Sequence, residues 1–374
     1  MTCVTHQAEA KSEGGFLAWH TAIAHLCIMS SSSQRHSAII PLAWPEMTAR
    51  GSEKIWAYLR KLGLIRNVNL MVGHAGMVLV EHDAFRYFDF GRYLTPRIMG
   101  RPRSEETDPK LALEARPRWD EHGQLANFEE LLQELEQKKA ATHGEGRMFA
   151  SIFYGGDVEK ALAFARNLQE KGYMGYNGLD RKQSNCARFV ATTILAALDP
   201  ASRAYRKFRY PVTLAPSPYF NVIAGASSGR FIIWHQGQGE WHQRPMGHAL
   251  TDILEKITYA FRRSKAAQLP PDTRVGQLQE PDHLPAGLPE GATYLGGIGE
   301  GAWHDVRVIA EDRLQMSRIN LEGVVEFTAD YQCDPEWSQN FLEGKVHLVH
   351  DTHFAWLTLA NKLTNERLRC RRIL

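Results

Sequence analysis

The sequence has few cysteines and no pattern that would join them. The five, Cys3, Cys27, Cys186, Cys333 and Cys370, are odd in number, widely spaced and form no C-x-x-C pair. A disulfide framework or a zinc knuckle is therefore disfavoured. We expect synthesis in a reducing compartment, at least one free thiol with a role of its own, and neither a metal nor another cofactor.

Strong net charge and long apolar runs are also missing. The 374 residues carry a formal net charge of only +2, and no basic stripe with interleaved aromatic residues occurs, so nucleic acid is not an expected partner. No apolar run has the length of a transmembrane helix. Residues 16–29 come nearest to a signal peptide, but His20 and His25 interrupt them and acidic residues precede them, which disfavours that interpretation.

Hydrophobic periodicity and turn residues predict an α+β fold. Residues 96–120, rich in Pro, Arg and Asp, are expected to form a long loop, and Asn127 with Glu130 has the spacing of a capping box. We expect a buried strand over residues 38–44, a hairpin from 69–80 and 85–93, and helices over 52–63, 127–135, 157–172, 184–198 and 248–263.

Composition divides the chain into four parts. Residues 1–36 are expected to be a poorly ordered N-terminal extension, and residues 37–265 a globular domain. Residues 266–289, rich in Pro, Gly and Asp, predict a linker. Short strand-like runs separated by turn residues then predict a small β-rich C-terminal domain over residues 290–374.

Cys186 is the candidate nucleophile. A thiol becomes reactive at neutral pH when a helix N-terminus or an adjacent imidazole lowers its pKa. Ser184 and Asn185 are favourable capping residues just before it, and the helix dipole then directs its positive end at the sulfur. The alternative is an inert core thiol, since cysteine is among the most buried residue types.

His74 is the candidate general base and acid. It follows Gly73 at the start of a predicted strand, and a hairpin turn near His82 would place Asp89 on the returning strand close to the imidazole. Asp89 could instead pair with a neighbouring arginine, Arg86 or Arg92. Glu46, in a turn after the first strand, is an alternative third residue, or simply a solvated carboxylate.

Two short motifs resemble a known family. GHAGMVLV and YFDFG, residues 73–80 and 87–91, resemble the histidine hairpin of NlpC-type papain-like hydrolases. SNCARFV, residues 184–190, resembles the nucleophile helix of the circularly permuted branch, which includes lecithin:retinol acyltransferase-like proteins. The resemblance covers roughly residues 37–225 and implies a permuted papain-like core, in which an antiparallel sheet packs on the cysteine-bearing helix. The hairpin turn is longer than is usual in the family, and the long stretch before Cys186 implies an insertion at residues 96–145.

The resemblance implies a cysteine amidase or peptidase that acts on peptides of the bacterial cell wall. A lipid acyl hydrolase or acyltransferase is the alternative within the fold, and a non-catalytic papain-like binding module is the alternative outside enzymes. Without a signal peptide, we expect cytoplasmic synthesis and export by a dedicated route, for example as an antibacterial effector of a type VI system with an immunity protein as partner.

Two further segments have simpler interpretations. HLVHDTH, residues 347–353, would place His347, Asp351 and His353 on one face of a strand, but no fourth ligand is evident, so we expect no metal site. GGIGEGAW, residues 296–303, does not fit the G-x-G-x-x-G pattern and precedes strands, so we expect a turn under Trp303 and no phosphate site.

Overall fold

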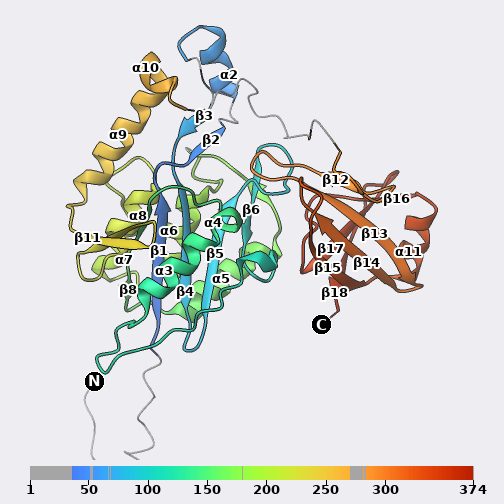
Figure 1. Cartoon of the computed structure of the whole chain (residues 1–374), viewed down its shortest axis with the longest axis horizontal. Coiled ribbons are helices and arrows are strands. Elements are labelled where there is room, and N and C mark those ends of the chain that lie inside the picture. Colours follow the sequence, from blue (N-terminus) through green and yellow to red (C-terminus); the bar gives the residue numbers. More distant parts are fainter. Residues whose placement is uncertain are drawn as a thin grey trace, which may run out of the picture. The chain divides into compact units, whose positions relative to one another are not determined.

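A computed structural model describes residues 36–50, 54–65, 67, 69–178, 180–269, 281 and 284–373. Apart from His36, the expected N-terminal extension lies outside the described residues, as do 270–280, 282 and 283 of the expected linker. Among the residues that are described, no helix is long and apolar enough to cross a membrane. Figure 1 shows the chain coloured from its N-terminus to its C-terminus.

The first sheet contains nine strands in the order β11-β10-β7-β1-β4-β5-β6-β9, with β8 also paired to β1. Neighbouring strands run antiparallel throughout. Its strands are β1 Ala38–Trp44, β4 His74–Val80, β5 Phe85–Gly91, β6 Met99–Arg103, β7 Met148–Ala150, β8 Phe153–Tyr154, β9 Met174–Gly175, β10 Phe231–His235 and β11 Gln238–His242. A separate short ladder joins β2 (Thr48–Arg50) to β3 (Asn69–Met71).

Helices cover both faces of this sheet, and its central strands are therefore buried along their whole length. Every residue of β1 and β4 is buried, as expected for strands packed on both sides. The helices around this sheet are α2 Lys54–Lys61, α3 Phe128–Gln137, α4 Lys139–Thr142, α5 Val158–Glu170, α6 Cys186–Ala196, α7 Arg203–Arg209, α8 Pro218–Gly225, α9 Gly247–Phe261 and α10 Arg263–Ala266, with a 3-10 turn at Pro109–Leu111. Residues of α5, α6, α7 and α8 form one apolar cluster with the sheet, and α3 packs on the opposite face.

The second sheet is built from residues 293–372. It has seven antiparallel strands in the order β12-β13-β14-β15-β18-β17-β16. Trp337 and Phe341 of α11 (Pro335–Leu342) pack on its apolar cluster. Its strands are β12 Thr293–Leu295, β13 Ala302–Ala310, β14 Arg313–Ile319, β15 Val325–Gln332, β16 Val346–Leu348, β17 Trp356–Asn361 and β18 Arg367–Arg372. The predicted combination of helices with antiparallel sheet is confirmed.

Two local predictions are wrong. The expected loop at residues 96–120 contains β6, which pairs with β5. The capping box at Asn127 does not form, because the Asn127 side chain instead binds the backbone of Arg116 and Arg118. The predicted helix over residues 248–263 forms as α9, and its apolar stripe is largely exposed. Four of the residues in this stripe are more than 40% exposed, namely Leu250, Leu254, Ile257 and Phe261.

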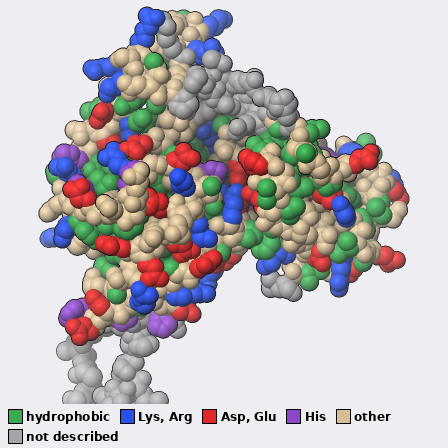
Figure 2. Space-filling view, viewed as in Figure 1, with side chains coloured by type: hydrophobic (Ala, Val, Ile, Leu, Met, Phe, Trp, Pro, Cys, Tyr) green, Lys and Arg blue, Asp and Glu red, His purple; other side chains and the backbone are tan. Residues whose placement is uncertain are grey.

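Charges of both signs are mixed on the molecular surface. Figure 2 shows Lys and Arg side chains interspersed with Asp and Glu side chains over the face in view. This distribution agrees with a formal net charge of only +2 for the whole chain. Several ion pairs also lie in the interior, and some of them connect residues that precede residue 110 to residues of the second sheet.

Candidate active site

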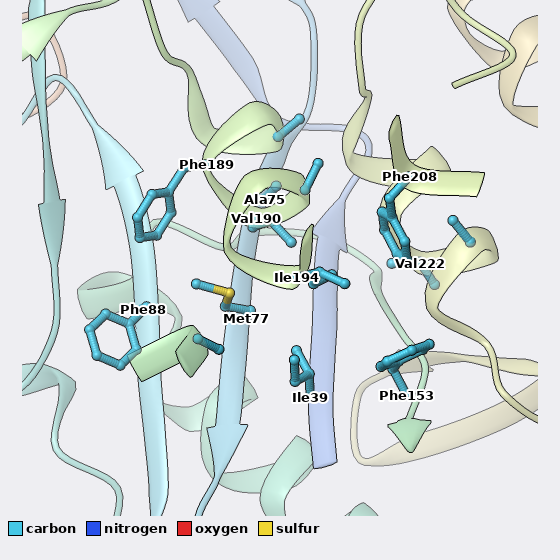
Figure 3. Packing of buried hydrophobic residues seen from close by; sticks show 14 of the residues in the cluster. Ile39, Ala75, Met77, Phe88, Phe153, Phe189, Val190, Ile194, Phe208 and Val222 are labelled. Atoms are coloured by element: carbon cyan, nitrogen blue, oxygen red, sulfur yellow. The ribbon is translucent and has the colours of Figure 1, made fainter. Parts of the chain in front are cut away.

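Cys186 is the first residue of α6. Asn185 caps this helix, since its side-chain oxygen accepts a hydrogen bond of 2.8 Å from the Arg188 backbone N–H. The helix is anchored by Phe189, Val190 and Ile194. Figure 3 shows these side chains in one apolar cluster with Ile39 of β1, Met77 of β4 and Phe88 of β5. The thiol is therefore held at the positive end of a rigid helix and is 7% exposed.

His74 is the first residue of β4 and lies directly opposite Trp44 in the β1–β4 ladder. The two rings stack with centroids 5.6 Å apart and planes inclined by 21°. This stacking fixes the plane of the imidazole, which is 9% exposed.

Gly73 makes the sharp approach to His74 possible. Its φ is +73°, a conformation that residues with a side chain rarely adopt. A Cβ there would also lie 3.3 Å from the ring of Pro218, from the Pro45 backbone and from the Trp44 carbonyl oxygen. The expected small neighbour of His74 is therefore needed for the backbone conformation as well as for space.

Asp89 reaches His74 from the adjacent strand. It lies opposite Gly76 in the β4–β5 hairpin, so its side chain shares a face with His74 two residues along. The Asp89 Oδ2 is 3.4 Å from His74 Nε2, which leaves Nδ1 of the ring for the thiol. Gly76 also makes room for Tyr87, whose hydroxyl donates to Asp89 Oδ2 at 3.2 Å.

Arg103 binds the other side of the Asp89 carboxylate. Its Nε donates to Oδ1 at 3.0 Å and its Nη2 to Oδ2 at 2.6 Å, and both side chains are fully buried. Burial disfavours the charged form of Asp89, but the positive charge of Arg103 and the hydrogen bond with His74 outweigh it and lower the pKa to about 2. Asp89 thus stays ionised at any working pH. Arg86, one of the two arginines considered from the sequence, instead binds Glu81 and Glu105.

The imidazole and the thiol perturb one another. Burial lowers the pKa of His74, yet its hydrogen bonds to Asp89 and to Cys186 raise it to about 9. Burial raises the pKa of Cys186, but His74, the Ala75 backbone N–H and the Tyr176 hydroxyl all stabilise the thiolate, and the net pKa is lowered. These shifts favour a thiolate–imidazolium pair at neutral pH.

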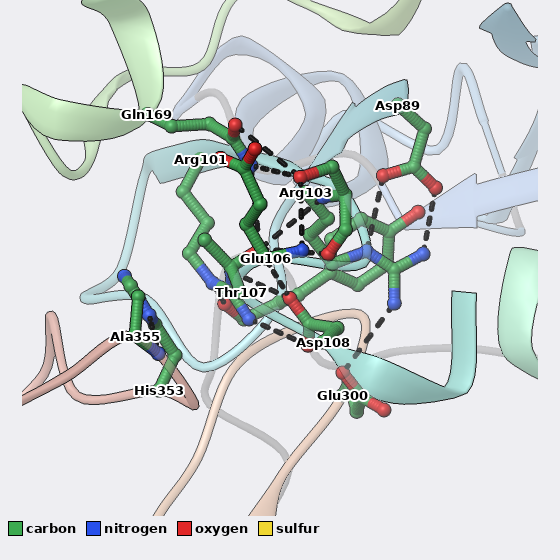
Figure 4. Close-up of polar contacts among 12 residues, drawn as sticks. Asp89, Arg101, Arg103, Glu106, Thr107, Asp108, Gln169, Glu300, His353 and Ala355 are labelled. Carbon is green, nitrogen blue, oxygen red and sulfur yellow. Dashed lines mark hydrogen bonds and ion pairs between the residues drawn. The ribbon is translucent and has the colours of Figure 1, made fainter. Parts of the chain in front are cut away.

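A chain of buried ion pairs continues from Arg103 into the second sheet. Figure 4 shows Arg103 between Asp89 and Glu300, with its Nη1 at 3.8 Å from Glu300 Oε2. The ring of Tyr93 lies over the Arg103 guanidinium at 3.6 Å. Glu300 Oε1 lies 3.0 Å from Arg318 Nη2 and also pairs with Lys110.

Asp108, the residue before the 3-10 turn, connects Arg318 to Arg101 of β6. Arg318 Nη1 lies 3.0 Å from Asp108 Oδ1, and Arg318 Nε lies 2.6 Å from Glu326 Oε2. Arg101 binds Asp108 with two bonds of 2.9 Å. Opposite charges are therefore paired throughout, which is the condition under which buried ions are tolerated.

The glycine-rich segment before β13 brings Glu300 to this position. Gly299 donates its backbone N–H to the Arg92 carbonyl at 3.0 Å, and Leu94 donates to the Glu300 carbonyl at 3.3 Å. A Cβ on Gly297 would lie 2.7 Å from the Arg92 carbonyl oxygen, so only glycine permits this approach. From the sequence we expected only a turn at residues 296–303. The glycines of this segment were the one signal in the sequence of a close backbone contact.

The other candidate residues are engaged elsewhere. Glu46 binds the Arg147 side chain and backbone N–H on the surface, so the structure pairs Asp89 rather than Glu46 with His74. In HLVHDTH the strand ends at Leu348, contrary to expectation, and Asp351 binds Arg369. Within the described part of the chain, no group of three or more His, Cys, Asp or Glu side chains is arranged to hold a metal ion.

Replacing Gly73 with alanine is expected to destabilise the fold by about 1–3 kcal/mol and to lower the reactivity of Cys186, because the strain falls on the turn that places His74. Urea unfolding and the rate of thiol alkylation measure the two effects. Gly63 is the matched control: its φ is +74° but nothing lies within 4 Å of its Cβ position. Gly63→Ala should therefore leave the alkylation rate unchanged, and equal effects on that rate would contradict the prediction.

Comparison with known proteins relates two separate stretches of the chain to protein families. Residues 39–202 match the family described as type VI secretion system effector TseH-like. Residues 292–370 match the family described as DUF6695 C-terminal domain. The crystal structure of the type VI secretion system effector TseH is similar to 57% of this chain and 100% of its own, at 18% sequence identity and a TM-score of 0.38. No curated protein matches the chain.

The first match includes the three residues that the structure brings together. It begins within β1 and ends after α6, and so contains His74, Asp89 and Cys186. The second match spans most of the second sheet, with Arg318 inside it and Glu300 as well. The first match thus covers most of the first sheet, without β10 and β11, and the second covers most of the second sheet. The buried ion pairs connect residues from both matches.

Proposed function

We propose that the chain is a cysteine hydrolase in which Cys186 is the nucleophile, His74 the general base and acid, and Asp89 the residue that orients His74. One observation carries the proposal: the buried His74 ring lies between the thiol at a helix N-terminus and an Asp89 held ionised by Arg103. Nucleophile, base and orienting group are the three parts that such catalysis needs.

The reaction follows from these positions. The Cys186 thiolate attacks the carbonyl carbon of an amide, and the backbone N–H of Cys186 at the helix start stabilises the oxyanion that forms. The protonated His74 gives its proton to the leaving amine as the C–N bond breaks. His74 then removes a proton from water, which attacks the thioester and releases the acid and the thiolate. Tyr176, whose hydroxyl reaches the sulfur, is a second donor close to the developing charge.

The order of the site residues supports a permuted papain-like core, with the histidine hairpin β4–β5 before the cysteine-bearing helix α6. In this proposal residues 37–265 form the catalytic domain and residues 290–374 a second domain that contributes Glu300 to the surroundings of Arg103. The domain boundaries and the kinship with lecithin:retinol acyltransferase-like proteins are part of the proposal.

The similarity of residues 39–202 to type VI effectors suggests the substrate and the partner. We propose cell-wall peptides as the substrate, cytoplasmic synthesis followed by export without a signal peptide, and an immunity protein as the partner in the producing cell.

Digestion of purified sacculi, followed by chromatography and mass spectrometry of the fragments, tests the proposed substrate. New amine and carboxyl termini are expected. Release of fatty acid from phospholipid vesicles with intact sacculi would favour the lipid hydrolase, and binding without cleavage of either substrate would favour the binding module.

Hydrolysis is expected to follow a bell-shaped dependence on pH. On the acid side the rate rises as Cys186 ionises, below the range of an ordinary thiol because its pKa is lowered. On the alkaline side the rate falls as His74 loses its proton near pH 9, because the leaving amine then lacks an acid. Alkylation of Cys186 by iodoacetamide should already be fast at pH 6 and should not fall above pH 9, since the thiolate persists. A thiol that reacts only above pH 8 would contradict the thiolate–imidazolium pair.

A further inference from the structure

Cys333 and Cys370 lie far apart in the sequence but meet inside the second sheet. Cys333 follows the last residue of β15, and Cys370 lies within β18. Tyr331 pairs with Arg372 and Gln332 with Arg371, so the antiparallel register places Cys333 opposite Cys370 at the next position. Their sulfur atoms are 2.9 Å apart, and both residues are buried.

Hydrogen bonding shows which kind of cross-strand position this is. Ile373 donates its backbone N–H to the Asp330 carbonyl, so residues 330 and 373 form a hydrogen-bonded pair. Such pairs alternate along an antiparallel ladder, which makes 333 and 370 a non-hydrogen-bonded pair. In agreement, the Cys333 backbone N–H is directed to the Asp312 carbonyl, away from β18. In such a pair the Cα atoms are about 4.5 Å apart, within the range that a disulfide spans.

We propose that Cys333 and Cys370 form a disulfide once the chain leaves a reducing compartment and meets a disulfide oxidant. From 2.9 Å the sulfur atoms need to approach by less than about 1 Å to reach bonding distance. The bond would join β15 directly to β18, whose Arg371 and Arg369 bind Glu170 of α5. This assignment is independent of the hydrolase activity, since neither cysteine belongs to the candidate active site.

Exchange with the oxidant proceeds in two steps. The Cys333 thiolate attacks one sulfur of the oxidant's disulfide and displaces the other as a thiolate, which takes up the proton that Cys333 lost. The Cys370 thiolate then attacks the Cys333 sulfur of the mixed disulfide and releases the second oxidant thiol. Two electrons and two protons pass to the oxidant. The S–H of Cys370 donates to Cys333 in the dithiol and lowers the pKa of the Cys333 thiol, which suits Cys333 for the first step.

The burial of both cysteines limits when an oxidant can reach them. Cys333 is 4% exposed and Cys370 1%, so a dissolved oxidant reaches them during folding or when the segment after β15 opens. The folded dithiol should therefore oxidise slowly, whereas a chain that folds in the presence of the oxidant should acquire the bond directly.

Refolding of the full-length, reduced protein in a mixture of reduced and oxidised glutathione tests the proposal. Peptide mapping without reduction is expected to show one linked peptide pair that contains residues 333 and 370, with a mass lower by two hydrogen atoms. The oxidised protein should melt about 5–15 °C above the same sample after dithiothreitol. Free thiols or separate glutathione adducts at both positions would overturn the assignment.

Three variants complete the experiment. Cys333→Ser and Cys370→Ser should each abolish the shift in melting temperature caused by dithiothreitol, because one partner is gone. Cys27→Ser is the matched control and should keep the shift. If either variant at 333 or 370 fails to fold, the peptide map of the wild-type protein decides alone. A shift that survives in a folded Cys370→Ser protein would assign the effect to another pair of cysteines.

Discussion

Cys186→Ala is expected to lower the rate of substrate hydrolysis by at least about 10⁴-fold, because no other group in the site can form the thioester. His74→Ala should have a similar effect, since it removes both the proton acceptor and the charge that stabilises the thiolate. Because the two residues act as one unit, the double variant should be no less active than either single variant. Initial rates on the fragments released from sacculi measure all three.

The control must separate loss of chemistry from loss of fold. Cys333→Ala, assayed in reducing buffer, removes another buried thiol and should keep turnover within a few fold of the wild type. Far-ultraviolet circular dichroism and melting temperature should be close to wild type for Cys186→Ala, since the cavity left by one sulfur is small. Turnover that survives in a folded Cys186→Ala protein would reject the proposed mechanism.

Glu300→Gln is expected to move the alkaline limb of the pH–rate profile downwards by about 0.5–1 unit. The substitution keeps the shape of the side chain but removes the negative charge beside Arg103. The excess positive charge that remains disfavours the imidazolium, so the pKa of His74 should fall from about 9. The free energy of unfolding should also fall by about 3–5 kcal/mol, because Arg103 and Arg318 lose a buried partner.

Glu46→Gln is the matched control for this charge. Glu46 forms a solvent-exposed pair with Arg147, so its loss should change the free energy of unfolding by less than about 1 kcal/mol and leave the pH–rate profile in place. The same variant also tests Glu46 as the orienting residue. A Glu300→Gln protein that is less stable but has an unshifted profile would show that Glu300 supports the fold without influencing His74.

The sequence was most informative where local and tertiary preferences agree. The helix at Cys186 has a capping residue, Asn185, followed by an apolar body, and the structure places the cap as expected. The hairpin that joins His74 to Asp89 has two buried strands and a short polar turn, and the position of that turn sets its register. These elements could be predicted because each is specified by its own residues.

The residues missed are those whose environment comes from distant parts of the chain. Arg101 and Arg103 lie on a strand with Pro102 between them, a composition that favours a loop. They are nevertheless buried, because Asp89 and Asp108 compensate their charges. Glu300 had no apolar or helical pattern around it, and its burial depends on a backbone contact more than two hundred residues away in the sequence. No local preference encodes such pairing.

The position of Glu300 also bears on how the two parts of this protein could be exchanged in evolution. Here a replacement for residues 292–370 would have to bring an acid to the same place beside Arg103, on a glycine-rich segment that fits against residues 92–94. A substitute that lacked it would leave uncompensated arginine charge next to the histidine. Exchange of either stretch alone would therefore remove a partner from these buried ion pairs.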